Sequence, residues 1–272
     1  MTSLLSVVWD VDPVFFSIGP LEVRWYGLSW ALALALSALI FHNIIKREGY
    51  SEKIFDSIFW YGVLSTVIGS RLGHCLFYDP AYYLVHPLEI FDLRQGGMAS
   101  HGAAVGLLVG LWLFSRKRKM PYIWSLDRIG IAVAIGGAIV RLGNLMNSEI
   151  YGTETSLPWG FIFVREGETV PKHPTQLYEA LAYLMIFVVM WWMYYKKKLA
   201  LRRPGLMFGF FLVALFGARI IIEAIKNPQV AFEHNMVLDM GQILSIPFVI
   251  AGAVIIWLAL KKPEAPLSKT KK

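Results

Sequence analysis

DRIGIAVAIGGAIVRLGNLM, residues 127–146, combines an uninterrupted apolar run with a polar end. The run and its continuation to residue 146 approach the roughly 20 residues that a helix needs to cross the hydrocarbon core of a bilayer. It leads directly into RLGNLMNSEIYG, residues 141–152, which holds an arginine, two asparagines and a glutamate. The sequence therefore predicts a buried or membrane helix that delivers polar side chains to one end.

The whole chain has the composition of a membrane protein, since 56% of its 272 residues are hydrophobic and only 17% are charged. A transmembrane β-barrel would need short segments that alternate apolar and polar residues, whereas the apolar stretches here are continuous. We therefore predict an all-α integral membrane protein with seven transmembrane helices. The expected spans are about Trp25–Ile45, Ile54–Phe77, Met98–Phe114, Ile129–Met146, Leu177–Tyr195, Leu206–Ile225 and Met240–Leu260.

The basic residues predict the orientation of these spans. They concentrate in the connections after the first, third and fifth spans and in the C-terminal tail, while the segment before the first span carries acidic residues. By the positive-inside rule the N-terminus lies outside and the C-terminus is cytoplasmic. The net charge of +7 is thus explained by topology, and we expect no nucleic-acid partner.

We expect one domain, residues 1–260, followed by a disordered basic cytoplasmic tail, residues 261–272. The long connection of about residues 151–172 lies outside in this topology, and we expect it to form a small extracytoplasmic cap containing a short β-hairpin. The first residues lack the basic region and the cleavage site of a secretory signal peptide, so the first span should be retained.

Polar clusters gather at the ends of the spans that face outward. The five stretches are SRLGHCLFYDP, GGMASHGAAVG, RLGNLMNSEIYG, KHPTQLYE and GARIIIEAIKNP. The cytoplasmic halves of the spans are almost purely apolar. Because a transport path needs polar residues from face to face, this asymmetry favours a shared site near the outer surface over a transporter or channel.

Arg71, Arg141 and Arg219 fall within apolar spans, where a charge is a functional hypothesis by default. The alternative is that each is an interfacial anchor whose stem lies in lipid. Arg219 has Glu223 one turn further along the helix, a spacing that allows an ion pair. Arg141 has Asn144 and Ser148 on its helical face, and such a polar stripe should face protein or water.

His101 lies between glycine-rich turns in GGMASHGAAVG, at the entrance of the third span. A lone histidine on an apolar face is often structural, so sequence position alone leaves its role open. The histidines are scattered without metal-binding spacing, and we expect no metal site. No phosphate-binding loop, dinucleotide fingerprint or serine nucleophile motif is present, and we expect no cofactor.

RLGNLMNSEIYG resembles the signature of the bacterial prolipoprotein diacylglyceryl transferases. FSIGPLEVRWYGL, SRLGHCLFYDP, GGMASHG, HPTQLYE, GARIIIE and MGQILSIP are each similar to stretches of that family in the same order, so the resemblance covers nearly the whole chain. Two positions depart from the family pattern. Ala103 stands where a second glycine usually follows the histidine, and Leu215 stands where a tyrosine is common.

The resemblance implies a lipid-modifying transferase of the bacterial cytoplasmic (inner) membrane. Such an enzyme moves the diacylglyceryl group of phosphatidylglycerol onto the lipobox cysteine of a prolipoprotein signal peptide, forms a thioether and releases glycerol phosphate. The expected partners are therefore phosphatidylglycerol, prolipoprotein signal peptides and membrane lipids, and the active site should lie near the extracytoplasmic leaflet. An inactive binding or scaffold protein of the same fold is the remaining alternative.

The resemblance also assigns roles to the polar residues. His101 fits the base that takes the thiol proton, and Arg141 and Arg219 fit the cations that bind the departing phosphate. A substrate-binding set is expected to surround them. Its members are Tyr26, Arg141, Asn144, Asn147, Glu149, Gly152 and Glu223.

Overall fold

The computed structural model describes residues 6–77, 79–92, 97, 99–227 and 238–265. Its contacts divide the chain into two compact units. The first comprises residues 1–40 and 127–267, and the second comprises residues 41–126 and 268–272. Each unit is described by itself below.

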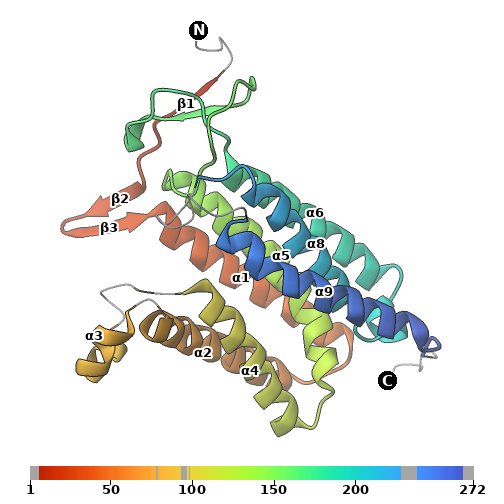
Figure 1. Ribbon diagram of the computed structural model, residues 1–272. Coiled ribbons are helices and arrows are strands. Elements are labelled where there is room, and N and C mark those ends of the chain that lie inside the picture. The colour runs from red at the N-terminus through yellow and green to blue at the C-terminus, as the bar shows by residue number, and fades with distance from the viewer. Residues whose placement is uncertain (1–5, 78, 93–96, 98, 228–237, 266–272) are drawn as a thin grey trace. The chain divides into compact units, whose positions relative to one another are not determined.

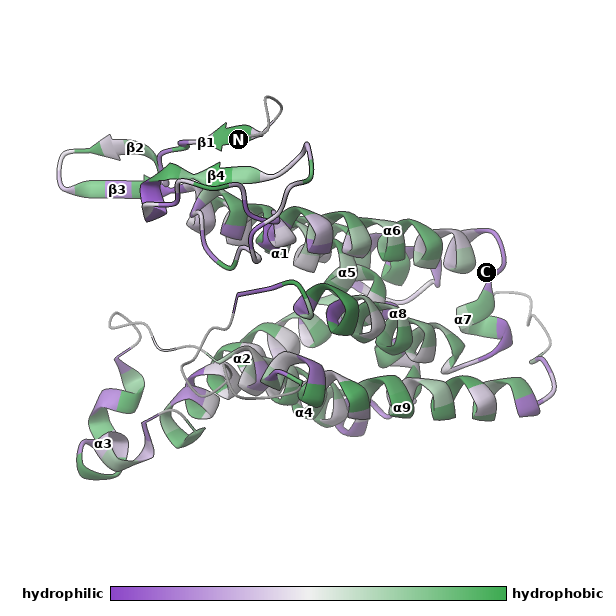
Figure 2. Ribbon diagram, turned by 45° about the horizontal axis from the view of Figure 1, so that its top comes forward, coloured by the Kyte–Doolittle hydropathy of each residue, from purple (hydrophilic) through white to green (hydrophobic). Residues whose placement is uncertain are grey.

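The first unit is built around α-helices (Figure 1). Its long helices are α1 (Trp25–Arg47, which belongs to this unit up to Ile40), α5 (Tyr122–Met146, from Asp127), α6 (Thr175–Tyr195), α8 (Leu206–Glu223) and α9 (Met240–Lys261), with the short α7 at Leu199–Arg202. Helix α5 packs against both α6 and α8, since a Cβ at Gly130 would lie 3.1 Å from Met190 and 3.2 Å from Phe211. Apolar residues predominate along α8 and α9 (Figure 2).

The second unit pairs α2 (Glu52–Phe77) with α4 (Ser100–Arg118), and carries α3 (Pro80–Val85) and the 3-10 helix η1 (Pro87–Phe91). Helices α2 and α4 approach closely through glycines. A Cβ added at Gly69 would overlap the carbonyl oxygen of Gly102, and one at Gly73 would lie 2.7 Å from the Cα of Gly102. Only residues without a side chain allow this backbone contact.

Five of the seven expected spans are supported by length and composition, namely α1, α5, α6, α8 and α9. These helices make the protein an integral membrane protein, as predicted. Helices α2 and α4 occupy the positions of the other two spans, but they do not reach the same apolar content. The first turn of α2 and the last turn of α4 carry charged residues. Met98, the expected start of the third span, lies outside the described residues.

Four short strands accompany the helices in the described residues. β2 (Val14–Ile18) and β3 (Leu21–Arg24) form an antiparallel hairpin, and β1 (Val7–Trp9) pairs in parallel with β4 (Phe161–Phe163). The hairpin expected within residues 153–171 is not formed as a two-stranded ladder, because β4 takes its partner from the N-terminal segment, and only isolated antiparallel bridges join Glu154 and Phe161 to Lys172. A local pattern cannot reveal such a distant partner.

The pairing of β1 with β4 closes a small hydrophobic cluster over the end of α5. Phe163 is fully buried beside Leu145 and Phe161, and Trp9 covers them. The Trp9 indole donates a hydrogen bond of 3.0 Å to the carbonyl of Leu145. The N-terminal segment is thereby fixed to the connection between α5 and α6. This connection continues through the 3-10 helix η3 (Val164–Glu166).

Helix α5 begins at Tyr122, seven residues earlier than expected, and therefore includes a buried charged residue, Asp127. Asp127 is fully buried, and its carboxylate accepts hydrogen bonds from the backbone N–H groups of Gly205 (2.7 Å) and Phe208 (2.9 Å). It therefore caps the N-terminus of α8 from a neighbouring helix. From the sequence, this end of the spans was expected to be almost purely apolar, and Asp127 was not anticipated.

The first residues of the expected tail make contacts with α7. Lys261 is still helical, Glu264 pairs with Arg203 at 3.2 Å, and the Ala265 N–H donates to the Arg202 carbonyl at 2.9 Å. The rest of the expected tail, residues 266–272, lies outside the described residues.

Candidate active site

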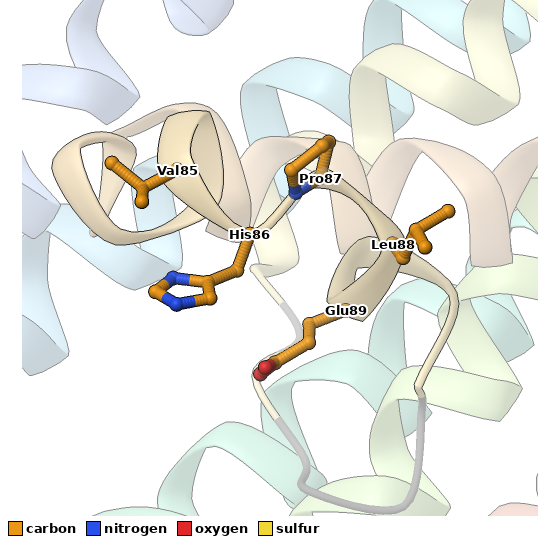
Figure 3. Close-up of a pocket in the computed structure, with 5 residues that line it drawn as sticks. All are labelled: Val85, His86, Pro87, Leu88 and Glu89. Atoms are coloured by element: carbon orange, nitrogen blue, oxygen red, sulfur yellow. The ribbon is translucent and has the colours of Figure 1, made fainter.

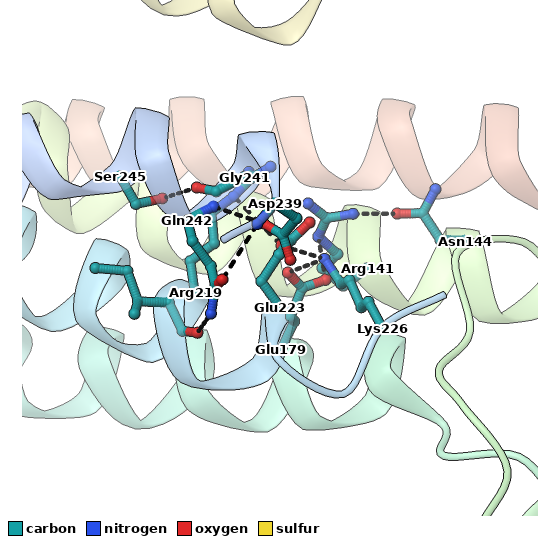
Figure 4. A network of polar contacts seen from close by, with 11 residues as sticks. Arg141, Asn144, Glu179, Arg219, Glu223, Lys226, Asp239, Gly241, Gln242 and Ser245 are labelled. Atoms are coloured by element: carbon teal, nitrogen blue, oxygen red, sulfur yellow. Dashed lines mark hydrogen bonds and ion pairs between the residues drawn. The ribbon is translucent and has the colours of Figure 1, made fainter. Parts of the chain in front are cut away.

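A chain of ion pairs joins α5, α6, α8 and the segment after α8 (Figure 4). Arg141 Nε lies 2.9 Å from Glu179 Oε2. The other oxygen of Glu179 accepts a hydrogen bond of 2.9 Å from Lys226 Nζ, which also donates to Glu223 Oε2 at 3.0 Å. Arg219 Nε lies 3.7 Å from Glu223 Oε2. The two arginines predicted to work together are thus linked through two carboxylates and a lysine.

The ion-pair chain is buried at its centre and partly exposed at its two ends. The side chains of Glu179 and Lys226 are 0% and 3% exposed, whereas those of Arg141 and Arg219 are 18% and 21% exposed. Burial of a charge costs several kcal/mol unless it is paired, and every charge at the centre is paired. The guanidinium groups of Arg141 and Arg219 are therefore the part of the ion-pair chain that a ligand can reach.

The polar residues at the end of α5 continue the network. Arg141 Nη1 donates to Asn144 Oδ1 at 3.2 Å, and Asn144 Nδ2 donates to Glu149 Oε1 at 3.0 Å. Asn147 Nδ2 donates to the same oxygen at 3.2 Å. The stripe expected to include Ser148 ends earlier, because α5 stops at Met146 and Ser148 adopts a left-handed conformation with φ 55°.

The turn after α5 is held in an unusual conformation by the start of α6. Ile150 has φ 62°, which is rare for a β-branched residue and costs about 1–3 kcal/mol. The Thr175 hydroxyl donates to the Ile150 carbonyl at 2.7 Å, and Gln176 Nε2 donates to the Glu149 carbonyl at 2.6 Å. The stretches RLGNLMNSEIYG and HPTQLYE therefore meet, as predicted for a shared site.

Gly152 and Tyr26, two further predicted site residues, contribute in different ways. A Cβ at Gly152 would overlap the carbonyl oxygen of Ile225, so this glycine allows the cap to lie against the end of α8. Its N–H donates to the His173 carbonyl at 2.8 Å. Tyr26 lies beside α5, since a Cβ at Gly143 would be 3.2 Å from its ring. Tyr26 is thus next to the turn that holds Arg141.

The cap residues beside this site have altered proton affinities. Burial and a hydrogen bond of 2.9 Å to Glu168 raise the pKa of Tyr151 to about 12. Lys172 pairs with the second carboxylate oxygen of Glu168 at 3.1 Å. Burial lowers the pKa of His173, whose Nδ1 lies 3.2 Å from the Tyr178 hydroxyl. Both titratable rings therefore remain neutral at neutral pH.

His101 lies in the first turn of α4 and is exposed. It belongs to the second unit, whereas the arginines and all the expected substrate-binding residues belong to the first. Ala103, the departure from the family pattern, lies two residues further along α4.

Arg71 has a structural role that the anchor hypothesis did not anticipate. Its side chain does not extend into lipid, since the residue is only 3% exposed. The guanidinium donates to the backbone carbonyls of Glu89 at 2.6 Å, Ile90 at 2.8 Å and Asp92 at 2.9 Å. Arg71 thus holds η1 and the adjoining Asp92 in place beside α2.

A separate depression of about 350 Å³ lies at the junction of α3 and η1 (Figure 3). Its lining residues are Val85, His86, Pro87, Leu88 and Glu89. None of these belongs to the predicted site. Among the described residues, no group of histidine, cysteine or acidic side chains is arranged to hold a metal ion.

Sequence reasoning missed Glu179 and Lys226, the two residues at the centre of the ion-pair chain. Both lie in polar stretches that were recognised, HPTQLYE and GARIIIEAIKNP. The available signal was a carboxylate entering the apolar fifth span, which requires a cation nearby. The sequence offered several cations, and only the fold selected Arg141 and Lys226.

A family model described as Prolipoprotein diacylglyceryl transferase matches residues 13–258. The chain belongs to this family. It is 44% identical to a protein of Porphyromonas gingivalis named phosphatidylglycerol–prolipoprotein diacylglyceryl transferase, over 99% of each chain. Proteins of the same name from Tolumonas auensis and Chloroherpeton thalassium are 42% and 41% identical, over 93% and 97% of this chain and 98% and 97% of their own.

Membership in the prolipoprotein diacylglyceryl transferase family confirms the resemblance read from the sequence motifs. The protein is a transferase of lipoprotein biosynthesis, and its reaction is the diacylglyceryl transfer step of lipoprotein maturation. The transporter alternative is thereby removed.

Proposed function

We propose that the protein transfers the diacylglyceryl group of phosphatidylglycerol to the lipobox cysteine of prolipoproteins at the Arg141–Arg219 site. The observation that carries this placement is the ion-pair chain of the first unit, in which two partly exposed guanidiniums are held by buried carboxylates. Arg141 and Arg219 come from different helices, α5 and α8, and belong to the same ion-pair chain.

The chemistry of the reaction explains the need for two arginines. The cysteine sulfur attacks the glycerol carbon that carries the phosphate, a carbon–sulfur bond forms, and the carbon–oxygen bond breaks. The phosphodiester leaves as a monoester, glycerol phosphate, which takes the electron pair and gains negative charge. Arg141 and Arg219 each approach a carboxylate through Nε, and their terminal nitrogens supply further N–H donors that match phosphate oxygens. Stabilising this developing charge lowers the barrier.

His101 serves as the base in this proposal. A cysteine with an ordinary pKa of about 8.5 is mostly protonated at neutral pH, so a neutral histidine that accepts its proton raises the thiolate population. The exposed position of His101 in the first turn of α4 is compatible with access by a peptide substrate.

The substrate-binding residues surround the arginines in the first unit. Asn144, Asn147 and Glu149 form one hydrogen-bonded group at the end of α5, which positions Arg141 and offers polar contacts to the headgroup of phosphatidylglycerol. Glu223 orients Arg219, and Gly152 lets the cap close against α8. Tyr26 lines the same end of the bundle.

The proposed membrane arrangement has seven spans, an external N-terminus and a cytoplasmic C-terminus. It treats residues 1–260 as one transmembrane domain, residues 151–172 as the extracytoplasmic cap and residues 261–272 as a cytoplasmic tail. Helices α2 and α4 support it, because 26 and 19 residues correspond to about 39 Å and 28 Å of helix. The site then lies near the extracytoplasmic leaflet of the inner membrane, within reach of lipid and signal peptide.

The test is a reconstituted transfer assay. Purified protein in vesicles containing phosphatidylglycerol is incubated with a lipobox peptide, and the peptide mass is measured. We expect a mass increase of one diacylglyceryl group and release of glycerol phosphate. A peptide with serine in place of the cysteine is the control and should gain nothing. Absence of product with the cysteine peptide would overturn the proposed function and favour an inactive binding protein.

A further inference from the structure

We propose that Lys226 is a positioning residue that keeps the arginine site positively charged and leaves guanidinium N–H groups of Arg141 and Arg219 available to phosphate. This inference rests on the proposed function and deepens it, because it assigns a role to a residue that contacts neither substrate. Lys226 lies just after α8, in the segment that follows Arg219 and Glu223.

The position of Lys226 between the two carboxylates is the first argument. Its ammonium donates to Glu179 at 2.9 Å and to Glu223 at 3.0 Å, and its side chain is 3% exposed (Figure 4). Each of these carboxylates also faces one arginine. Lys226 therefore occupies lone pairs of Glu179 and Glu223 that would otherwise be available to the N–H groups of the arginines.

The charge balance is the second argument. The ion-paired chain contains three cations, Arg141, Lys226 and Arg219, and two anions, Glu179 and Glu223, so its formal charge is +1. Without Lys226 each arginine would face one carboxylate and the chain would be neutral. A neutral ion-pair chain attracts an anionic phosphate less strongly, and one unit of charge has a greater effect in a partly buried site than in water. Lys226 thus supplies the excess charge without touching the ligand.

The backbone fixes the lysine in this place. Lys226 N–H donates to the Glu223 carbonyl at 3.0 Å, and Lys226 forms an isolated antiparallel β-bridge with Gly152 of the cap. The neighbouring Ile225 carbonyl accepts from the Thr153 N–H at 2.9 Å. Since two sides of the segment are anchored, the ammonium has little freedom to leave the carboxylates.

The test compares Lys226→Met, Lys226→Arg and the double variant Lys226→Met/Glu223→Gln in the transfer assay. Lys226→Met should raise KM for phosphatidylglycerol and lower kcat/KM about tenfold or more, while Lys226→Arg, which keeps the charge, should retain most activity. The double variant returns the formal charge of the chain to +1, with a glutamine that can still accept from Arg219. It should recover part of the activity that Lys226→Met loses.

Lys172→Met is the matched control, because Lys172 is also largely buried and paired with two carboxylates, Glu154 and Glu168, but lies outside the ion-pair chain. It should lose stability without a rise in KM. Thermal unfolding of every variant separates loss of folding from loss of function. Binding of phosphatidylglycerol, measured without the peptide, provides a readout that does not need turnover.

Unchanged KM and phosphatidylglycerol binding in Lys226→Met would overturn the inference while leaving the proposed function intact. Equal losses in Lys226→Met, Lys226→Arg and the double variant would also overturn it, because they would indicate a packing role. Wild-type protein that binds phosphatidylglycerol but forms no product would overturn the proposed function instead, and the binding comparison would still test Lys226.

Discussion

Arginine and lysine carry the same charge, yet the contacts of Arg141 distinguish them. Its guanidinium contacts Glu179 through Nε and Asn144 through Nη1, which a single ammonium cannot reproduce in the same geometry. An interfacial anchor would need only the charge and a long stem. We infer that these contacts suit a phosphate clamp, and replacement of the arginine by lysine tests this role against that of a membrane anchor.

We expect Arg141→Lys and Arg219→Lys to insert and fold but to lose most of their transfer activity, by about tenfold or more in kcat/KM. The measurement is the initial rate of peptide modification at several phosphatidylglycerol contents. Near-wild-type rates in both variants would show that the arginines are anchors.

His101→Gln should bind phosphatidylglycerol normally but turn over poorly at neutral pH, because glutamine cannot accept the thiol proton. Raising the pH toward about 8.5, the ordinary cysteine pKa, should partly restore its rate, since the thiolate then forms without a base. Full activity at neutral pH would make the histidine structural. Inactivity without alkaline rescue would indicate that it positions a substrate.

His173 gives a stability prediction with a defined sign. Its pKa is lowered in the folded protein by burial, so when the pH falls through the ordinary value of 6.5 the unfolded chain takes up a proton that the folded protein does not. Stability is therefore greatest above pH 6.5 and falls as the pH decreases toward the lowered folded pKa. His173→Asn should lose less thermal stability than the wild type between about pH 7 and pH 5. If thermal stability falls equally with pH in both proteins, His173 does not contribute to the pH dependence.

At the scale of elements, buried polar contacts connect helices that are apolar elsewhere. Asp127 on α5 caps α8, and Thr175 and Gln176 on α6 hold the turn after α5. In lipid, unsatisfied backbone groups have no water to bind, so such contacts carry more of the packing specificity than in a soluble core.

We expect Asp127→Ala to reduce the free energy of unfolding by about 2 kcal/mol or more, because two buried N–H groups of α8 lose their acceptor. Activity per folded molecule should stay near that of the wild type, since Asp127 lies about four helical turns from Arg141 along α5. Asp127→Asn, which keeps one acceptor oxygen, should lose less. Denaturant unfolding in detergent measures the difference. Equal stability of all three proteins would refute the role of Asp127 in capping the N-terminus of α8.

At the scale of the whole molecule, the orientation in the membrane decides whether the site faces exported substrates. A reporter fused after Lys119 or at the C-terminus should report the cytoplasm, and one inserted near Glu166 should report the outside. A reporter after Phe77, at the end of α2, should also report the outside if α2 crosses the membrane. A cytoplasmic signal near Glu166 would remove the proposed access of lipoproteins to the site.

The sequence by itself determined the helical membrane character and the local contacts. Continuous apolar runs indicate helices whatever their neighbours, and the i,i+4 spacing of Arg219 and Glu223 produces their pairing on any helix. The order of the motifs along the chain was sufficient to identify the family. These features depend on residues close together in the chain.

Only the tertiary structure decided which distant residues meet. Lys226 and Glu179 are 47 residues apart, and the paired residues Val7 of β1 and Phe161 of β4 are 154 residues apart. Several cations and several strand-like segments were compatible with the sequence, so no local pattern selected among them. Burial selects the partners. A charge or a strand edge that packing removes from water needs a partner, and only residues that the fold brings close can provide one.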